Sequence, residues 1–119
     1  MFYKCYDITE IDLSNFDTSE VRFMWSMLSQ CSSLTSLNLS NFNTSKVTSM
    51  NEMFYQCSSL TSLNLSNFDT PKVSLIKQMF YSCINLEYIN MKNFKETSLL
   101  KDYGAMFTYV PNNIVVCIN

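Results

Sequence analysis

The 119-residue chain contains no histidine and only one glycine, and both shortages restrict the chemistry that it can perform. Histidine is the commonest general base beside a serine or cysteine nucleophile, so its absence argues against nucleophilic catalysis. A single glycine, Gly104, cannot build a P-loop or a G-x-G-x-x-G dinucleotide-binding turn. Glu10 and Asp12 form a carboxylate pair, but no recognisable pocket accompanies them. We therefore expect neither enzymatic activity nor a bound cofactor.

Sites for metals, nucleic acids and membranes also lack the residues that they require. A metal site needs several converging ligands, whereas the five cysteines lack C-x-x-C spacing and histidine is absent. Eight basic against ten acidic residues leave no cationic cluster that could follow a phosphate backbone. The longest apolar run, 114–118, is far shorter than the ~20 residues of a membrane helix. We expect no metal, no nucleic acid partner and no membrane span in this segment, and no signal peptide lies within the chain.

Apolar side chains, by contrast, are abundant. Hydrophobic residues make up 47% of the chain, including nine Phe, seven Tyr and eight Met, which is too apolar for a disordered polar tract. The length fits one core, so we expect a single domain over residues 1–119.

A tandem repeat organises these residues. The motif Leu-Ser-Asn-Phe begins at Leu13, Leu39 and Leu65 and returns as Met-Lys-Asn-Phe at Met91, with a period of 26 residues. The same period carries a column of cysteines, which are Cys5, Cys31, Cys57 and Cys83. In the fifth copy the register slips by one residue and Val110 takes the cysteine position. Independent columns that keep one register indicate repeats stacked into one continuous core.

The first half of each repeat predicts a strand. Leu34, Leu37 and Leu39 form an L-x-x-L-x-L pattern whose second half alternates apolar and polar residues, as a strand with one buried face does. Residues 41–46 that follow have the chemistry of a turn.

The second half of each repeat predicts a helix. Apolar residues recur there at intervals of three and four, which is typical of one buried helix stripe; they are Val47, Met50, Met53, Phe54 and Cys57. Ser49 and Glu52 match the S-x-x-E capping box of a helix start.

Stacking such units predicts the overall fold. We expect an α/β architecture, a right-handed leucine-rich-repeat solenoid of about five 26-residue strand-loop-helix repeats with a parallel sheet. Two buried ladders should run through it, Leu37, Leu63 and Ile89 in one and Phe42, Phe68 and Phe94 in the other.

The repeat also resembles that of a known family. Residues 57–70, followed by Met79-Phe80-Tyr81-Ser82-Cys83, closely resemble the BspA-like leucine-rich repeat surface proteins, and the likeness covers essentially the whole chain. The resemblance implies an extracellular or cell-surface protein that adheres to host or matrix proteins. The first repeat departs from the family pattern at Ile8 and Ile11, and the last departs at Asn113.

Two surfaces are candidates for partner binding. The open sheet face would carry two columns between the buried leucines, Glu10, Ser36, Ser62 and Tyr88 in one and Asp12, Asn38, Asn64 and Asn90 in the other. These short polar side chains could bind a partner, keep the sheet soluble, or hydrogen-bond to one another from repeat to repeat. Phe23 and Trp25 form the second candidate, because the next repeat has polar residues there. A small rotation of the element or an upstream segment could instead cover Trp25.

The cysteine column has two interpretations. Neighbouring cysteines would lie about 5 Å apart, which permits disulfides. Their place on the buried stripe favours free thiols packed as small apolar residues, and Cys117 has no obvious mate.

The leading functional hypothesis is a non-catalytic adhesion module that binds a host or matrix protein. The alternative is a structural spacer or antigenic coat segment without a dedicated ligand. Natural solenoids end in atypical capping repeats, whereas this sequence starts at Met1 within a predicted helix and stops on an apolar predicted strand. We therefore also expect a fragment of a longer array or end-to-end association.

Overall fold

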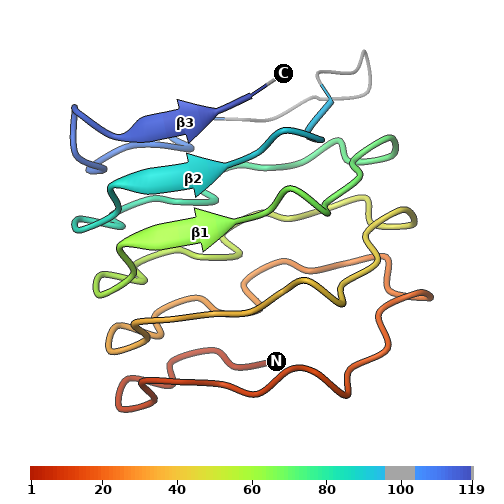
Figure 1. The fold of residues 1–119 in the computed structure, drawn as a ribbon, viewed down its shortest axis with the longest axis horizontal. Helices are drawn as coiled ribbons and strands as arrows, with labels where there is room; N and C mark the ends of the chain where they lie inside the picture. Colours follow the sequence, from red (N-terminus) through yellow and green to blue (C-terminus); the bar gives the residue numbers. More distant parts are fainter. Residues whose placement is uncertain (96–103, 119) are drawn as a thin grey trace.

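The chain winds into successive turns that lie one above the other, and one side of the stack carries a small parallel sheet (Figure 1). The computed structural model describes residues 1–95 and 104–118. Within them the strands are β1 (Ser62–Asn64), β2 (Tyr88–Asn90) and β3 (Val115–Cys117), in the spatial order β1-β2-β3. Both strand pairs are parallel, and Ile89 is paired with Leu63 on one side and Val116 on the other.

The 26-residue period appears directly in the hydrogen bonds between turns. The backbone N–H of Glu87 donates to the carbonyl of Thr61 at 2.8 Å, and that of Thr35 donates to Thr9 at 3.0 Å. The wall that contains β1, β2 and β3, here called the strand wall, therefore continues below β1 into segments that are not assigned as strands. The prediction of parallel pairing in register is confirmed for the three strands.

The predicted helices are absent from the described part of the chain, so the predicted fold class is wrong. The structure is not an α/β solenoid of strand-loop-helix units, because the second half of each repeat is a series of tight turns. In the third repeat, Met53 donates to the carbonyl of Met50 at 3.3 Å, and Cys57 donates to Phe54 at 3.1 Å. These bonds span three residues, whereas an α-helix bonds residues four apart.

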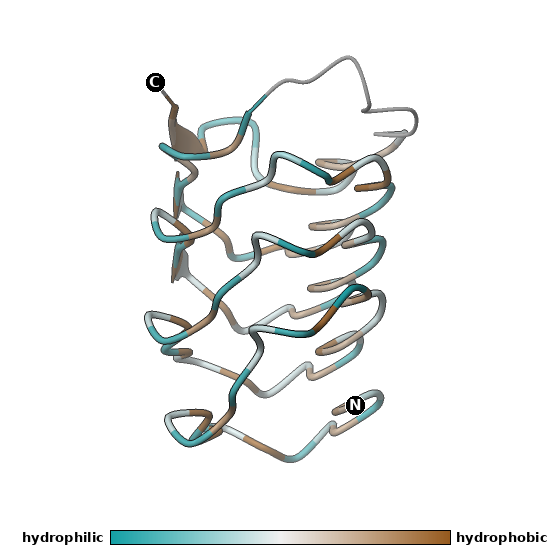
Figure 2. Cartoon of the chain, turned by 90° about the vertical axis from the view of Figure 1, so that its right-hand side faces the viewer, coloured by the Kyte–Doolittle hydropathy of each residue, from teal (hydrophilic) through white to brown (hydrophobic). Residues whose placement is uncertain are grey.

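The remaining N–H groups of this segment bond to the next turn of the stack. Glu52 donates to the carbonyl of Lys77 at 2.9 Å and Phe54 donates to that of Met79 at 3.0 Å. This second side of the stack is here called the turn wall. Figure 2 shows the strands along one edge of the molecule and the turns along the opposite edge.

Left-handed backbone conformations produce the tight turns. Non-glycine residues with positive φ recur at the same two places in successive repeats; they are Lys4, Ser26, Gln30, Glu52, Gln56, Gln78, Ser82, Ala105 and Tyr109. A single residue in this conformation interrupts a helix. Glu52, the expected capping residue, itself has a φ of 56°, so the predicted capping box does not form.

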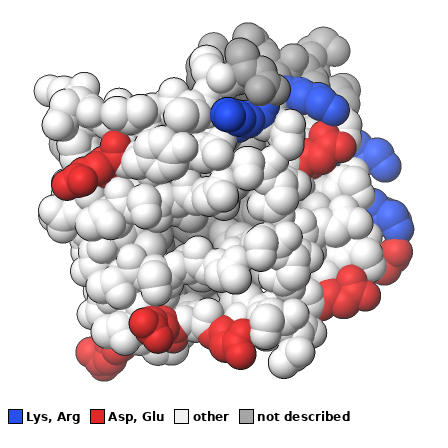
Figure 3. Space-filling model, in the orientation of Figure 1, with Lys and Arg blue, Asp and Glu red and all other residues white. Residues whose placement is uncertain are grey.

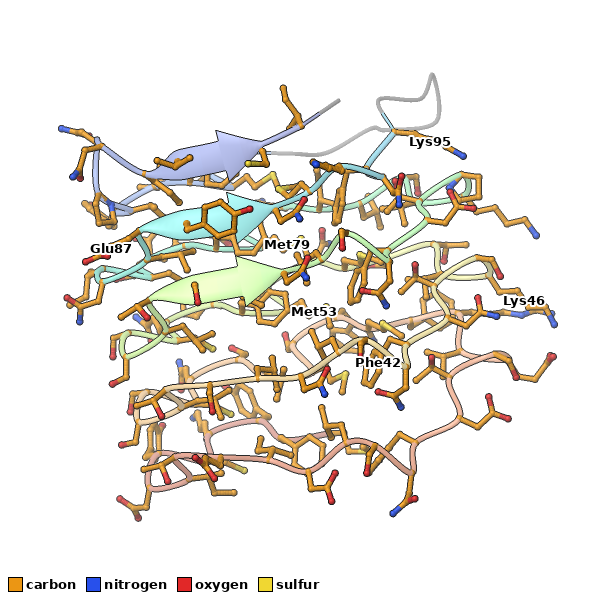
Figure 4. All side chains as sticks on the ribbon, in the orientation of Figure 1. Phe42, Lys46, Met53, Met79, Glu87 and Lys95 are labelled. Carbon is orange, nitrogen blue, oxygen red and sulfur yellow. The ribbon has the colours of Figure 1, made fainter. Side chains whose placement is uncertain are left out.

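The core lies between the two walls and consists of matched side chains from successive turns. Phe68 stacks on Phe42 at a ring-centroid distance of 6.4 Å and on Phe94 at 6.3 Å, which confirms the predicted phenylalanine ladder. Figure 4 shows Met53 and Met79, both fully buried, in neighbouring turns of the stack. Burying these aromatic and aliphatic columns is the main favourable term for folding.

A second column of asparagines, which was not among the predicted site residues, links each turn of the stack to the turn before it by hydrogen bonds. The side-chain amide of Asn67 donates to the carbonyls of Leu39 at 2.9 Å and Phe42 at 3.0 Å. Asn41 makes the corresponding bonds to Leu13 and Phe16 one repeat earlier. Carbonyl groups that the irregular backbone leaves unpaired are satisfied in this way.

Candidate functional site

The first predicted column lies on the outside of the strand wall. Its members Glu10, Ser36, Ser62 and Tyr88 are all exposed. Ser62 and Tyr88 are paired in adjacent strands, whereas the other two precede the assigned strands. The Tyr88 side chain is 37% exposed, so part of the ring is available to a partner.

The second predicted column already uses its side-chain oxygens within the chain. Asp12, Asn38, Asn64 and Asn90 each accept a hydrogen bond from the backbone N–H two residues later, at 2.9, 3.0, 3.1 and 3.3 Å. Hydrogen bonds from Ser14 hold the pKa of the Asp12 carboxyl below its ordinary value. The side chains of this column therefore stabilise the turns in which they lie. Their oxygens form these local hydrogen bonds in place of the suggested bonds from one repeat to the next.

Phe23 and Trp25 lie on the turn wall and are 64% and 66% exposed. Phe23 forms a bridge with Ser49, which occupies the same position in the next repeat. The two aromatic side chains border an open hollow of about 780 Å³. Because the strand wall and the turn wall are opposite edges of the molecule (Figure 2), the structure does not bring Trp25 and Tyr88 into one site.

The hollow contains residues that the sequence analysis did not identify. Phe16 is 37% exposed, and Met1 and Tyr3 are 70% and 52% exposed. The sequence did contain one signal that the first repeat differs from the later ones, because acidic residues are concentrated there. These residues are Asp7, Glu10, Asp12, Asp17 and Glu20. Figure 3 shows acidic side chains along the lower margin of the molecule.

Two carboxylates give the hollow its charge. Asp17 lines it and accepts a hydrogen bond from the backbone N–H of Ser19 at 2.9 Å. The hydrogen bonds from Ser19 hold the pKa of this carboxyl below its ordinary value, so it is ionised at neutral pH. Glu52 also lines the hollow and accepts a hydrogen bond from the hydroxyl of Ser26 at 3.1 Å. The hollow is thus lined mainly by apolar and aromatic side chains, together with these two carboxylates.

The cysteines are free thiols, as their position predicted. Cys31, Cys57 and Cys83 are fully buried, and each donates to a carbonyl 29 residues earlier, at 2.9, 3.1 and 3.0 Å. Burial raises the pKa of Cys83 to about 12, and burial likewise raises the pKa of Cys57. A thiol with such a pKa is a poor nucleophile at neutral pH.

Two further properties concern ions and membranes. Over residues 1–95 and 104–118, no group of three or more histidine, cysteine or carboxylate side chains is placed to hold a metal ion. No helix in the same residues is long and apolar enough to cross a bilayer.

The comparison with protein families places the chain. It belongs to the family described as "Mycoplasma protein of unknown function, DUF285", which it matches over residues 1–114. No curated protein and no solved structure matches the chain. The BspA-like resemblance noted from the repeat is not confirmed by these comparisons, whereas membership of the DUF285 family is shown.

Proposed function

We propose that this chain is a non-catalytic module of an extracellular or cell-surface protein, and that it binds another protein through the hollow beside Trp25. The observation that carries the proposal is the exposure of Phe23 and Trp25 on the rim of an apolar hollow of about 780 Å³. Large exposed aromatic side chains around a depression are the residues that most often dominate binding energy at protein interfaces.

Several features support a binding role over catalysis. The chain lacks histidine, and Cys57 and Cys83 are buried with raised pKa values. One of the two carboxylates of the hollow, Asp17, is held ionised by hydrogen bonds, which suits it to attract positive charge and not to transfer protons at neutral pH. Adhesion to a host or matrix protein is the specific form of this function that we propose.

A binding array tests the proposal. The purified chain is applied to a panel of extracellular matrix and cell-surface proteins, together with a Trp25→Ala, Phe23→Ala variant and a Tyr88→Ala control on the strand wall. We expect specific binding that the double variant loses and the Tyr88→Ala variant retains.

Two other outcomes would change the assignment. Binding lost in the Tyr88→Ala variant alone would move the site to the strand wall, where Ser62 and Tyr88 lie side by side. No specific binding by any variant would favour a structural spacer. The side-chain oxygens of Asn38 and Asn64 already accept hydrogen bonds within the chain, which suits that role.

A further inference from the structure

Two tyrosines on the turn wall lie face to face in neighbouring turns of the stack. The ring centroids of Tyr55 and Tyr81 are 5.0 Å apart, and the ring planes differ by 5°. We propose that this pair is a site of oxidative modification, at which a haem peroxidase with hydrogen peroxide joins the two rings by a carbon–carbon bond. The bond would link the third repeat covalently to the fourth. The inference goes beyond the protein-binding function proposed above and does not depend on it.

Equivalent backbone turns hold the two rings in this arrangement. The N–H of Tyr55 donates to the carbonyl of Glu52 at 3.1 Å. The N–H of Tyr81 makes the corresponding bond to Gln78 at 3.2 Å. Between the two turns, the N–H of Gln56 donates to the carbonyl of Tyr81 at 2.8 Å. The two side chains therefore leave the turn wall from equivalent positions one turn apart, and their rings stack in the offset or parallel manner that aromatic pairs favour.

The pair lies inside the stack, with a turn on either side of it. Phe54 and Phe80, the residues immediately before the two tyrosines, are fully buried and stack at 5.6 Å with planes 3° apart. The carbonyl of Tyr55 accepts a bond from the N–H of Gln30 in the preceding turn at 2.7 Å. The N–H of Ser82 donates to the following turn at 2.8 Å. The geometry of the pair is therefore fixed by its neighbours within the stack and not by either end of the chain.

An oxidant in solution can reach both rings. Tyr55 and Tyr81 are half-buried, so part of each side chain faces solvent. The neighbouring thiols of Cys57 and Cys83 are fully buried, and burial raises the pKa of both. Because the thiolate is the reactive form of cysteine, these two thiols compete poorly with the phenols for an oxidant.

The stacked arrangement is the one that the coupling reaction requires. Each phenol first loses one electron and one proton, which gives a phenoxyl radical whose unpaired electron is shared between the oxygen and the ring carbons ortho and para to it. The new bond joins two ortho carbons and forms along their π orbitals, which are perpendicular to the ring planes, so the rings must approach face to face. The hydrogens on the two joined carbons then move to the oxygens and restore both phenols. In total the pair gives up two electrons and two protons, which reduce one hydrogen peroxide to two waters at the peroxidase.

The next tyrosine of the turn wall provides an internal comparison. Tyr109 meets Tyr81 at a similar centroid distance of 5.3 Å, but the ring planes are at 85°. Tyr109 has a φ of 60° and takes the place of Ser82, whose φ is 59°, because the register slips by one residue in the last repeat. One ring of this pair presents its edge to the other, so their π orbitals do not overlap. Distance alone would allow both pairs to couple, whereas orientation selects Tyr55 and Tyr81.

Oxidation of the intact chain tests the proposal. The protein is treated at low concentration with a haem peroxidase and hydrogen peroxide, and the monomer is isolated under denaturing conditions. We expect dityrosine fluorescence, a mass lower by two hydrogen atoms, and a tryptic map in which peptide 47–72 is joined to peptide 78–92, with fragmentation placing the link at Tyr55 and Tyr81. The linked monomer should also unfold at a higher urea concentration, because a cross-link restricts the unfolded chain.

Two variants, each of which removes one hydroxyl group, locate the bond. Tyr55→Phe keeps an aromatic ring in the stack but cannot form a phenoxyl radical, so it should abolish the linked monomer. Tyr109→Phe is the matched control and should leave the yield of linked monomer unchanged. Thermal melts before oxidation check that both variants are folded, and the peptide map of the unaltered chain decides the matter even if one of them is not.

The other outcomes would overturn the inference. If Tyr109→Phe abolishes the link and Tyr55→Phe does not, the edge-on pair is the one that couples and the argument from orientation fails. If dityrosine forms only between chains, or forms within the monomer only after the chain is unfolded in urea, the stacked pair of the folded protein is not the site. The binding array is unaffected by either result, so the proposed function is judged separately.

Discussion

The thiol of Cys57 donates a hydrogen bond to the carbonyl oxygen of Leu28 at 3.1 Å, across the boundary between two turns of the stack. Cys83 makes the equivalent bond to Phe54 at 3.0 Å. The column of cysteines is therefore a set of buried donors that join each turn to the one before it. Two predictions depend on this arrangement.

The first concerns the reactivity of the thiols. Cys31, Cys57 and Cys83 are fully buried, whereas Cys5 and Cys117 are partly exposed. An aromatic disulfide reagent applied to the native protein should therefore label Cys5 and Cys117 quickly and the other three only after denaturation. Peptide mapping after a short exposure checks this, and rapid labelling of Cys57 would contradict the hydrogen-bonded, buried column.

The second concerns alkaline pH. Burial raises the pKa of Cys83 to about 12, above the value of about 8.5 for an unfolded thiol. The unfolded chain therefore releases this proton first, and stability falls as the pH rises from about 9 towards 12, whereas below about pH 8 the thiol is protonated in both states and stability does not depend on its titration. Urea unfolding at pH 8 and at pH 10.5 measures the loss, which should be smaller in a Cys83→Ser variant because a hydroxyl does not titrate in this range.

The asparagine column makes a third prediction. The Asn67 amide donates to the carbonyls of Leu39 and Phe42, so Asn67→Asp would replace a donor by an ionised acceptor. We expect a loss of about 1–3 kcal/mol at neutral pH, with partial recovery below the pKa of the new carboxyl, where it regains a proton to donate. Urea unfolding at pH 7 and pH 3.5 tests both parts.

Asn64→Asp is the matched control for that experiment. The Asn64 side chain accepts a bond from the backbone of Ser66, and Asp12 makes the same bond to Ser14 in the first repeat. Because the carboxylate keeps this acceptor, stability should change little. A larger loss of stability for Asn64→Asp than for Asn67→Asp would contradict the assignment of Asn64 as an acceptor and Asn67 as a donor.

The sequence predicted which residues share a column far better than it predicted the conformation between them. Any structure that returns every 26 residues must place Phe42, Phe68 and Phe94 together, so the phenylalanine ladder followed from the period alone. The helix did not follow from it. Linked three-residue turns also bury residues three and four positions apart. The spacing of Met50, Met53 and Phe54 is therefore compatible both with a helix and with the turns that the structure contains.

The candidate site was predicted only in part, for a physical reason. Phe23 and Trp25 were identified because the next repeat has polar residues at their positions, and both prove to be exposed. The remaining lining includes Tyr3, Phe16 and Asp17, whose positions in the hollow depend on how the first turn packs against the second. Such packing depends on the path of the backbone. Because the second half of each repeat was predicted to be a helix, the sequence pattern gave a wrong path there and could not predict which side chains meet.

A fourth prediction concerns the left-handed residues that distinguish this structure from a helical repeat. Gln56 has a φ of 56°, a conformation that costs a residue with a Cβ atom about 1 kcal/mol or more. Gln56→Gly should therefore stabilise the protein by about 0.5 kcal/mol, after allowing for the greater freedom of glycine in the unfolded chain. Ser59→Gly, at a position without a positive φ, should destabilise it. In a helix both substitutions would be unfavourable, so denaturant unfolding of the two variants decides between the conformations.

The fifth prediction separates stability from binding. Phe54 is fully buried and stacks on Phe80 at 5.6 Å, so Phe54→Ala should cost about 3–5 kcal/mol through lost burial and the cavity it leaves. Phe23→Ala removes a side chain that is 64% exposed and should change the unfolding free energy by less than about 0.5 kcal/mol. Denaturant unfolding compares the two variants under one condition. A large loss for Phe23→Ala would mean that Phe23 stabilises the fold, and a binding defect in that variant would then no longer identify the hollow as an interface.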